Sequence, residues 1–227
     1  FGGATSLTSL TIPNSVTTIS DSVFSGLSSL TSLTIGSSVE SIGSNAFGGA
    51  TSLTSLTIPN SVTTISSSAL YGLSSLETLT LGSAVTTIGS DAFLGTGLTS
   101  LVIPDSVTSI GSSAFKDATA LTSLVIPDSV TSIGSSAFEG ATALTSVTLG
   151  SAVETIGSKA FYNSALTSLT IPDSVTSIGK LAFAKVPIKT LVVGKGLANQ
   201  SSVGGGAFYG VCPTLESVSI NSPNALG

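Results

Sequence analysis

Serine and threonine hydroxyls recur at even spacing along this sequence and are its first candidates for nucleophilic chemistry or ligand binding. A serine nucleophile needs a base beside it, and the 227 residues include no histidine, so only a lysine or a carboxylate could serve. The serines recur at regular, solvent-facing strand positions and do not single out one site. Cys212, the one cysteine, lacks a base for the same reason and is expected in the core or in a turn. We therefore expect no enzyme activity and no cofactor.

Three aspartates that directly follow proline are the candidate metal ligands: Asp105, Asp128 and Asp173. Asp105 and Asp128 are 23 residues apart, and in a chain that coils with that period their carboxylates would lie on adjacent coils and could share Ca²⁺. The alternative is an Asx-type turn, which needs only a side-chain oxygen. Because Asn14 and Asn60 occupy the equivalent places without a charge, we expect turns and no metal site.

The element that positions all of these groups is a repeat of 23 residues. LTSLVIPDSVTSIGSSAFKDATA, residues 98–120, is followed at once by a copy that differs only at Lys116/Glu139 and Asp117/Gly140. Repeats open at Leu7, Leu30, Leu53, Leu76, Leu98, Leu121, Leu144 and Leu166, and positions are counted from these leucines. Those that open at Leu76, Leu144 and Leu166 are one residue short. A fixed period of this length is typical of a solenoid, in which each coil contacts its neighbours.

The period also predicts the domain organisation, a single solenoid over residues 1–227. Residues 1–6 end a preceding repeat, residues 7–187 form eight repeats, residues 188–214 form an irregular ninth repeat, and residues 215–227 form a partial one. Residues 1–6 match residues 47–52 letter for letter, so we expect the chain to be part of a longer array. The ninth repeat holds a longer loop and the glycosylation acceptor pattern Asn199-Gln200-Ser201.

Within a repeat, the apolar pattern predicts two short strands and one tight turn. Positions 3 to 6 alternate, as in Ser9-Leu10-Thr11-Ile12, which indicates a strand with one buried face. Proline or glycine at position 7 ends that strand. Positions 10 to 13 form a second extended segment on another face. The Ala-Phe pair at positions 17 and 18 is expected in a single helical or 3₁₀ turn, with the phenylalanines of successive coils stacked in a buried column.

Threonine recurs at two exposed positions of this pattern, which we take as the candidate binding surface. Position 2 holds Thr8, Thr31, Thr54, Thr99, Thr122, Thr145 and Thr167, and position 5 holds Thr11, Thr34, Thr57, Thr80, Thr148 and Thr170. Val102, Val125 and Val192 interrupt the second column. Flat, uncharged threonine arrays are typical of ice-binding surfaces, although threonine is also simply a good strand residue for a solvated face.

Composition excludes several classes of partner. Charged residues make up 7% of the chain and the net charge is −5, with six lysines, no arginine and eleven carboxylates. Nucleic acid requires a basic surface, so we expect none as a partner. No apolar run approaches the roughly 18 residues that cross a bilayer, so no membrane span is expected. So few charges do little to oppose contact between copies, which leaves self-association into polymers open.

The pattern L-x-x-L-x-I-P-x-S-V-x-x-I-G-x-x-A-F resembles the BspA-like class of leucine-rich repeats. The resemblance is close over residues 1 to about 193 and looser beyond. In that class a cysteine often stands three residues after the phenylalanine. This chain differs, because it has Ala50, Ala118 and Ala141 at that position. It also carries serines such as Ser61 in place of an asparagine ladder. The resemblance implies a leucine-rich-repeat solenoid with a parallel sheet on one face, from a surface-exposed or secreted protein of bacteria or protists linked to adhesion.

These observations together predict a non-enzymatic, extracellular or cell-surface protein that binds a protein or glycan partner through its Ser/Thr-rich strand faces. Two alternatives remain open from the residues alone. One is a structural filament or surface-layer protein that self-assembles, and the other is an ice-binding protein.

Overall fold

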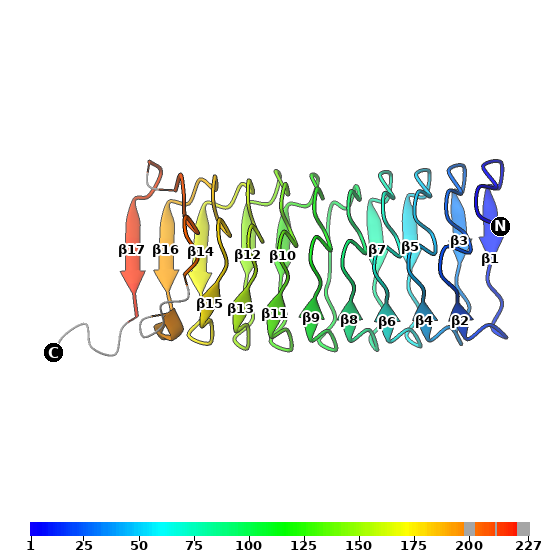
Figure 1. Cartoon of the computed structure of the whole chain (residues 1–227), viewed down its shortest axis with the longest axis horizontal. Coiled ribbons are helices and arrows are strands. Elements are labelled where there is room, and N and C mark those ends of the chain that lie inside the picture. Colours follow the sequence, from blue (N-terminus) through cyan, green and yellow to red (C-terminus); the bar gives the residue numbers. More distant parts are fainter. Residues whose placement is uncertain (198–202, 212, 222–227) are drawn as a thin grey trace.

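The computed structural model describes residues 1–197, 203–211 and 213–221. The chain is a stack of about nine coils, built almost entirely of parallel strands and turns. Figure 1 shows the coils side by side along one axis, with β1 and β17 at opposite ends of the stack. The predicted leucine-rich-repeat solenoid is thus confirmed. Within the described residues, no helix has the length and apolar character needed to cross a membrane.

The first row of strands forms from positions 3 to 6 of the repeat. It comprises β1 (Ser9–Thr11), β3 (Ser32–Thr34), β5 (Ser55–Thr57), β7 (Thr78–Thr80), β10 (Ser123–Val125), β12 (Ser146–Thr148), β14 (Ser168–Ile171), β16 (Thr190–Val193) and β17 (Ser217–Ile220). The row is divided into four sheets, β1 with β3, β5 with β7, β10 with β12, and β14 with β16 and β17. Within each sheet the strands pair in parallel at equivalent repeat positions, as in Leu10 with Leu33. Between β7 and β10, the coil that opens at Leu98 contributes only the bridge between Val102 and Val125. Leucine points inward and Ser or Thr outward, as alternation requires.

The second row forms from positions 12 and 13 and makes one continuous sheet of eight strands. It comprises β2 (Thr18–Ile19), β4 (Ser41–Ile42), β6 (Thr64–Ile65), β8 (Thr87–Ile88), β9 (Ser109–Ile110), β11 (Ser132–Ile133), β13 (Thr155–Ile156) and β15 (Ser177–Ile178). Each isoleucine of this row is buried, with at most 2% of its surface exposed. The second extended segment predicted from positions 10 to 13 is confirmed, on a separate sheet.

The Ala-Phe segments differ from the expected helical turn. They form consecutive turns, and the described residues contain a single short helix, η1 (Lys195–Leu197). The reason is that alternate N–H groups donate to the next coil and not back along their own coil. Asn45, Phe47 and Gly49 donate to the carbonyls of the following coil at 3.2, 2.9 and 2.8 Å. Residues at positions 16 and 20 take positive φ, for example 54° at Asn45, which no right-handed helix allows. We call this third row of inter-coil hydrogen bonds the turn ladder.

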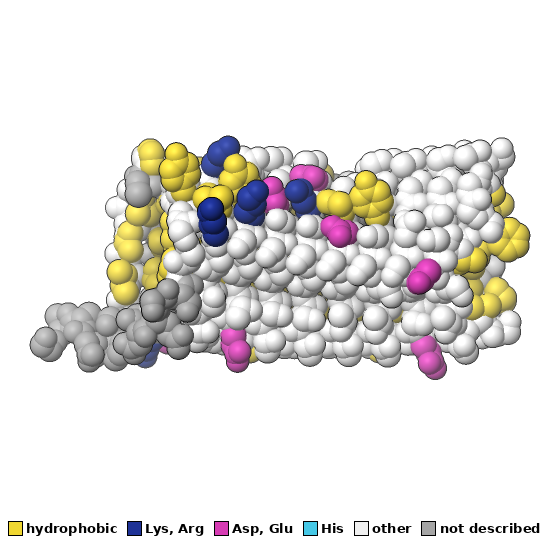
Figure 2. Space-filling view, in the orientation of Figure 1, with side chains coloured by type: hydrophobic (Ala, Val, Ile, Leu, Met, Phe, Trp, Pro, Cys, Tyr) yellow, Lys and Arg dark blue, Asp and Glu magenta, His cyan; other side chains and the backbone are white. Residues whose placement is uncertain are grey.

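The core is a column of phenylalanine rings inside the turn ladder. Consecutive rings are nearly parallel with centroids 5.2 to 5.5 Å apart through most of the column, as between Phe115 and Phe138. Leu70 replaces one ring and is fully buried, as are six of the phenylalanines. Backbone and side chains that are neither charged nor hydrophobic make up most of the surface seen in Figure 2. The hydroxyls therefore cover an aliphatic and aromatic interior.

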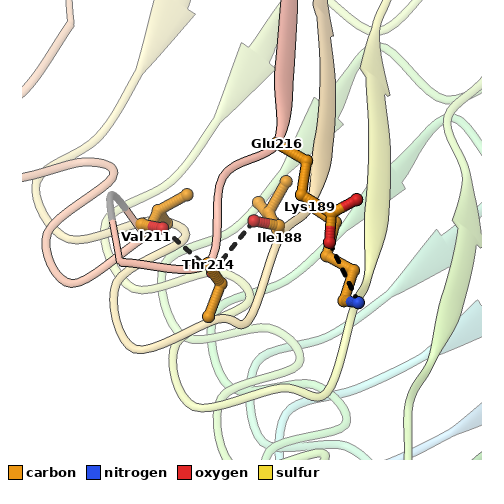
Figure 3. A network of polar contacts seen from close by, with 5 residues as sticks. All are labelled: Ile188, Lys189, Val211, Thr214 and Glu216. Atoms are coloured by element: carbon orange, nitrogen blue, oxygen red, sulfur yellow. Dashed lines mark hydrogen bonds and ion pairs between the residues drawn. The ribbon is translucent and has the colours of Figure 1, made fainter.

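The irregular last coils are joined to the stack by side chains as well as by strand pairing (Figure 3). The Thr214 hydroxyl lies 2.9 Å from the carbonyl oxygens of both Ile188 and Val211. Lys189 and Glu216 form an ion pair at 3.1 Å. Because both of these charged side chains are more than half exposed, the ion pair adds little stability, and the pairing of β16 with β17 holds this end.

Candidate functional site

All thirteen predicted threonines are exposed, but the structure divides them into two kinds. At position 2 some of the hydroxyls bond to the preceding coil. Thr31 donates to the carbonyl of Thr8 at 3.1 Å, Thr99 to that of Glu77 at 3.4 Å, and Thr145 to that of Thr122 at 3.3 Å. These three hydroxyls are therefore only partly available to a ligand.

At position 5 the threonines face outward at the ends of the first-row strands. Thr11 lies in register with Thr34, and Thr57 with Thr80. Among the described residues, these hydroxyls make no hydrogen bond to the rest of the chain. This column is thus a set of free hydroxyls held at the spacing of the coils.

A third outward column was missed by sequence reasoning. Position 3 lies two residues before position 5 and so on the same face of each strand. Its serines and threonines are exposed, namely Ser9, Ser32, Ser55, Thr78, Ser100, Ser123, Ser146, Ser168, Thr190 and Ser217. The alternation of the strand was the signal that could have found them. Positions 3 and 5 together form what we call the strand face.

Two valines interrupt the strand face near its middle. Val102 and Val125 are 78% and 60% exposed and pair across neighbouring coils. They border a shallow hollow of about 540 Å³ that also includes Asp105, Asp128 and Thr148 in its lining. At this hollow, apolar side chains and carboxylates adjoin the hydroxyls of the strand face.

Two of the aspartates after proline, Asp128 and Asp173, bind the backbone of the next coil, which differs from the expected turn within their own coil. The Asp128 carboxylate accepts the N–H of Ser151 at 2.6 Å, and Asn60 accepts the N–H of Ser83 at 2.9 Å. Hydrogen bonds from Ser151 hold the pKa of Asp128 below its usual value. In the described part of the chain, no three His, Cys, Asp or Glu residues are grouped to hold a metal ion.

Serine at position 9 has a structural role. Ser61, Ser106, Ser129 and Ser174 each donate to a carbonyl of the preceding coil at 2.6 to 2.7 Å. These bonds form a serine ladder between coils, at the place where an asparagine ladder was expected from the resemblance. The predicted glycosylation site Asn199, and Cys212, lie outside the described residues.

A family model described as BspA type leucine rich repeat region, in six copies, matches residues 1–122 and 108–226. Comparison with curated proteins finds no match.

A solved structure of a leucine-rich-repeat protein shares the fold. This protein, from Bacteroides ovatus, is 24% identical with a TM-score of 0.72, and the match covers 95% of this chain and 64% of that one. The chain thus spans somewhat less than two thirds of that relative. A pneumococcal vaccine antigen is 23% identical with a TM-score of 0.48, covering 96% and 69% of the two chains. A leucine rich cell surface protein from Faecalibacterium prausnitzii is 24% identical with a TM-score of 0.42, covering 96% and 80%. Since the family model spans nearly the whole sequence, the chain belongs to the BspA-type leucine-rich-repeat family.

Proposed function

We propose that the chain is a non-enzymatic adhesion module of an extracellular or cell-surface protein, which binds a protein or glycan through its strand face. The observation that carries the proposal is the register of free hydroxyls at positions 3 and 5 along the first row of strands. A hydroxyl both donates and accepts, so a row of them can bond to backbone amides or to sugar hydroxyls alike. Each contact is weak, and affinity would come from many of them made at once.

The test is a binding screen against extracellular-matrix proteins and a glycan array, followed by a triple variant in the strand face. Thr34→Val, Thr57→Val and Thr80→Val together replace three free hydroxyls by isosteric methyl groups. The matched control is Thr63→Val, Thr86→Val and Thr108→Val, which makes the same change at position 11, where the hydroxyls bond to the preceding coil. We expect saturable binding that weakens at least about tenfold, or about 1.4 kcal/mol, in the strand-face variant only. Equal effects in both variants would argue against the strand face.

Self-assembly is the second candidate function, favoured by the chain's 7% content of charged residues. Net repulsion between copies is correspondingly weak. Negative-stain electron microscopy over a concentration series checks this directly, since a structural protein should form long polymers without a partner. The exposed threonine columns also keep ice binding open as a third candidate, which predicts faceted ice crystals at low protein concentration.

A further inference from the structure

The chemical variety of this repetitive chain is concentrated on the turn ladder, away from the strand face. All three tyrosines occupy position 19: Tyr71, Tyr162 and Tyr209. The two repeats that are otherwise identical differ only at positions 19 and 20, where Lys116 and Asp117 are replaced by Glu139 and Gly140. Figure 2 shows lysines, carboxylates and hydrophobic side chains gathered along the upper edge, over the middle and C-terminal coils. Discrimination between partners requires such variety, which the strand face lacks.

The backbone of the turn ladder aligns these side chains and is itself saturated. The N–H of position 20 donates to the position 19 carbonyl of the next coil, from Gly140 to Tyr162 at 2.9 Å, from Asn163 to Ala184 at 3.1 Å, and from Lys185 to Tyr209 at 2.9 Å. The position 19 side chains therefore follow one another along the stack. Because these N–H groups are already paired, a partner cannot add a strand here and must be recognised by side chains.

Toward the C-terminal end, this edge carries lysines and tyrosines together, which we call the cationic–aromatic patch: Lys159, Tyr162, Lys180, Lys185 and Tyr209. The Nζ atoms of Lys159 and Lys185 lie 5.5 and 5.2 Å from the centroid of the Tyr162 ring. The backbone of Lys159 bonds to that of Lys180 on the next coil. Tyr209 is 68% exposed.

The charge of this patch is not neutralised within the described residues. Its three lysines take part in none of the ion pairs found there, whereas Lys116 on the same edge pairs with Glu139 at 3.5 Å. Interaction with the Tyr162 side chain raises the pKa of Lys185 above its usual value. The chain as a whole carries a net charge of −5, whereas the three lysines give this patch a positive charge.

The turn does not require lysine at position 20. Lys185 has a φ of 60° there, a region in which long side chains are unfavourable. Gly49, Gly72, Gly95 and Gly140 fill the same position in other coils with the same sign of φ. Lys185 is therefore a residue that the fold could replace by glycine.

We propose that the cationic–aromatic patch binds an acidic polysaccharide, with the ammonium groups contacting carboxylate or sulfate groups and the exposed Tyr209 ring packing against the apolar face of a sugar. The partly buried Tyr162 ring holds the ammonium groups of Lys159 and Lys185 beside it, and Tyr209 lies two coils further along, beyond the buried Ala184. An acidic peptide would use the charges but would have no need of the exposed ring. This surface is distinct from the strand face, so the proposal goes beyond the adhesion function above.

The experiment measures binding of heparin and hyaluronan to the full chain at low and physiological salt, with neutral dextran and poly-glutamate as comparison probes. We expect binding to at least one acidic polysaccharide that weakens with salt, and no binding to dextran. Tyr162→Ala and Lys185→Gly should each weaken it at least about tenfold, while Lys185→Gly raises the melting temperature because strain is relieved. Lys195→Ala, which removes one positive charge elsewhere, is the matched control and should change the affinity less than about threefold.

Separate outcomes would overturn the proposal. These are no binding of either polysaccharide at low salt, equal or tighter binding of poly-glutamate, or equal effects of Lys185→Gly and Lys195→Ala. Thr34→Val, Thr57→Val and Thr80→Val together should leave this binding unchanged, which separates it from the strand-face function. If that triple variant loses polysaccharide binding while Tyr162→Ala does not, the strand face is the site and the cationic–aromatic patch is not.

Discussion

Replacing Phe138 by alanine tests the claim that the phenylalanine column carries the stability of the stack. The Phe138 side chain has no exposed surface, and its ring stacks on Phe115 and Phe161 with centroids 5.4 and 5.3 Å away and interplanar angles of 4° and 12°. Burial of one such side chain contributes roughly 1.5–3 kcal/mol, and each stacked neighbour adds about 0.5–1.5 kcal/mol. Truncation also leaves a cavity, and we expect a total loss of about 3–5 kcal/mol.

The assay is denaturant unfolding followed by far-ultraviolet circular dichroism, with the free energy of unfolding taken from the midpoint and slope. Phe1 provides a matched control in the same column, because it is 86% exposed and stacks on Phe24 alone at 6.0 Å. Phe1→Ala should therefore cost less than about 1 kcal/mol. Phe138→Leu should fall between the two, since Leu70 occupies the equivalent position in another coil and is fully buried.

A loss below about 1 kcal/mol for Phe138→Ala, or one no larger than that for Phe1→Ala, would refute the reasoning. Two separate transitions in the variant would have another meaning. Coils contact mainly their neighbours, so a weakened central coil can let the two halves unfold independently. In that case the loss should be read from the transition that includes the central coils.

Three further predictions concern polar groups of the stack. Ser164→Ala should raise the free energy of unfolding by about 1 kcal/mol, because the Ser164 hydroxyl is the one buried side-chain polar atom without a hydrogen bond among the described residues. Thermal melts check this. Thr96→Ala is the control and should be destabilising, because it removes a hydroxyl that is hydrogen-bonded. Ser129→Ala should cost about 0.5–1.5 kcal/mol by loss of its bond to the carbonyl of Val107, and no loss in a denaturant titration would remove the serine ladder as a stabilising element. The third concerns pH. Because the pKa of Asp128 in the folded chain is lowered from 3.8, its carboxylate stabilises the fold above pH 3.8, and this stabilisation is lost as the pH falls through the lowered pKa. The stability of the wild type relative to Asp128→Asn should therefore fall as the pH drops below about 4, and a difference in melting temperature that stays constant from pH 6 to pH 2.5 would contradict this.

The repeat made the fold predictable because near-identical segments can bury the same face only by stacking in register. Alternation in Ser9-Leu10-Thr11-Ile12 was enough to place leucine inside and threonine outside. Proline at position 7 set the end of the strand, and the phenylalanine at position 18 predicted the buried column. These inferences rest on local geometry and on hydrophobic burial, which every coil obeys in the same way.

The role of individual polar groups was harder to predict, because a donor or acceptor can bond within its coil or across to the next. Asp128 and Asn60 were expected to close their own turns, yet both accept an N–H from the following coil. Thr31 was grouped with Thr34 as part of one binding surface, yet its hydroxyl bonds to the stack while that of Thr34 faces outward. A hydrogen bond within the coil and one to the next coil are compatible with the same sequence pattern. Which of them forms depends on how close the donor or acceptor lies to the neighbouring coil.

The sequence by itself determined the period, the inward residues and hence the solenoid, since these follow from side-chain hydrophobicity and strand geometry along one repeat. Only the tertiary structure decided how the Ala-Phe segments turn, because the competing hydrogen-bond acceptors lie on the adjacent coil. That choice brings Lys159 and Lys185, from different repeats, to the same Tyr162 ring. The contact depends on where successive coils place positions 16, 19 and 20 in space, and spacing along one chain does not contain that information.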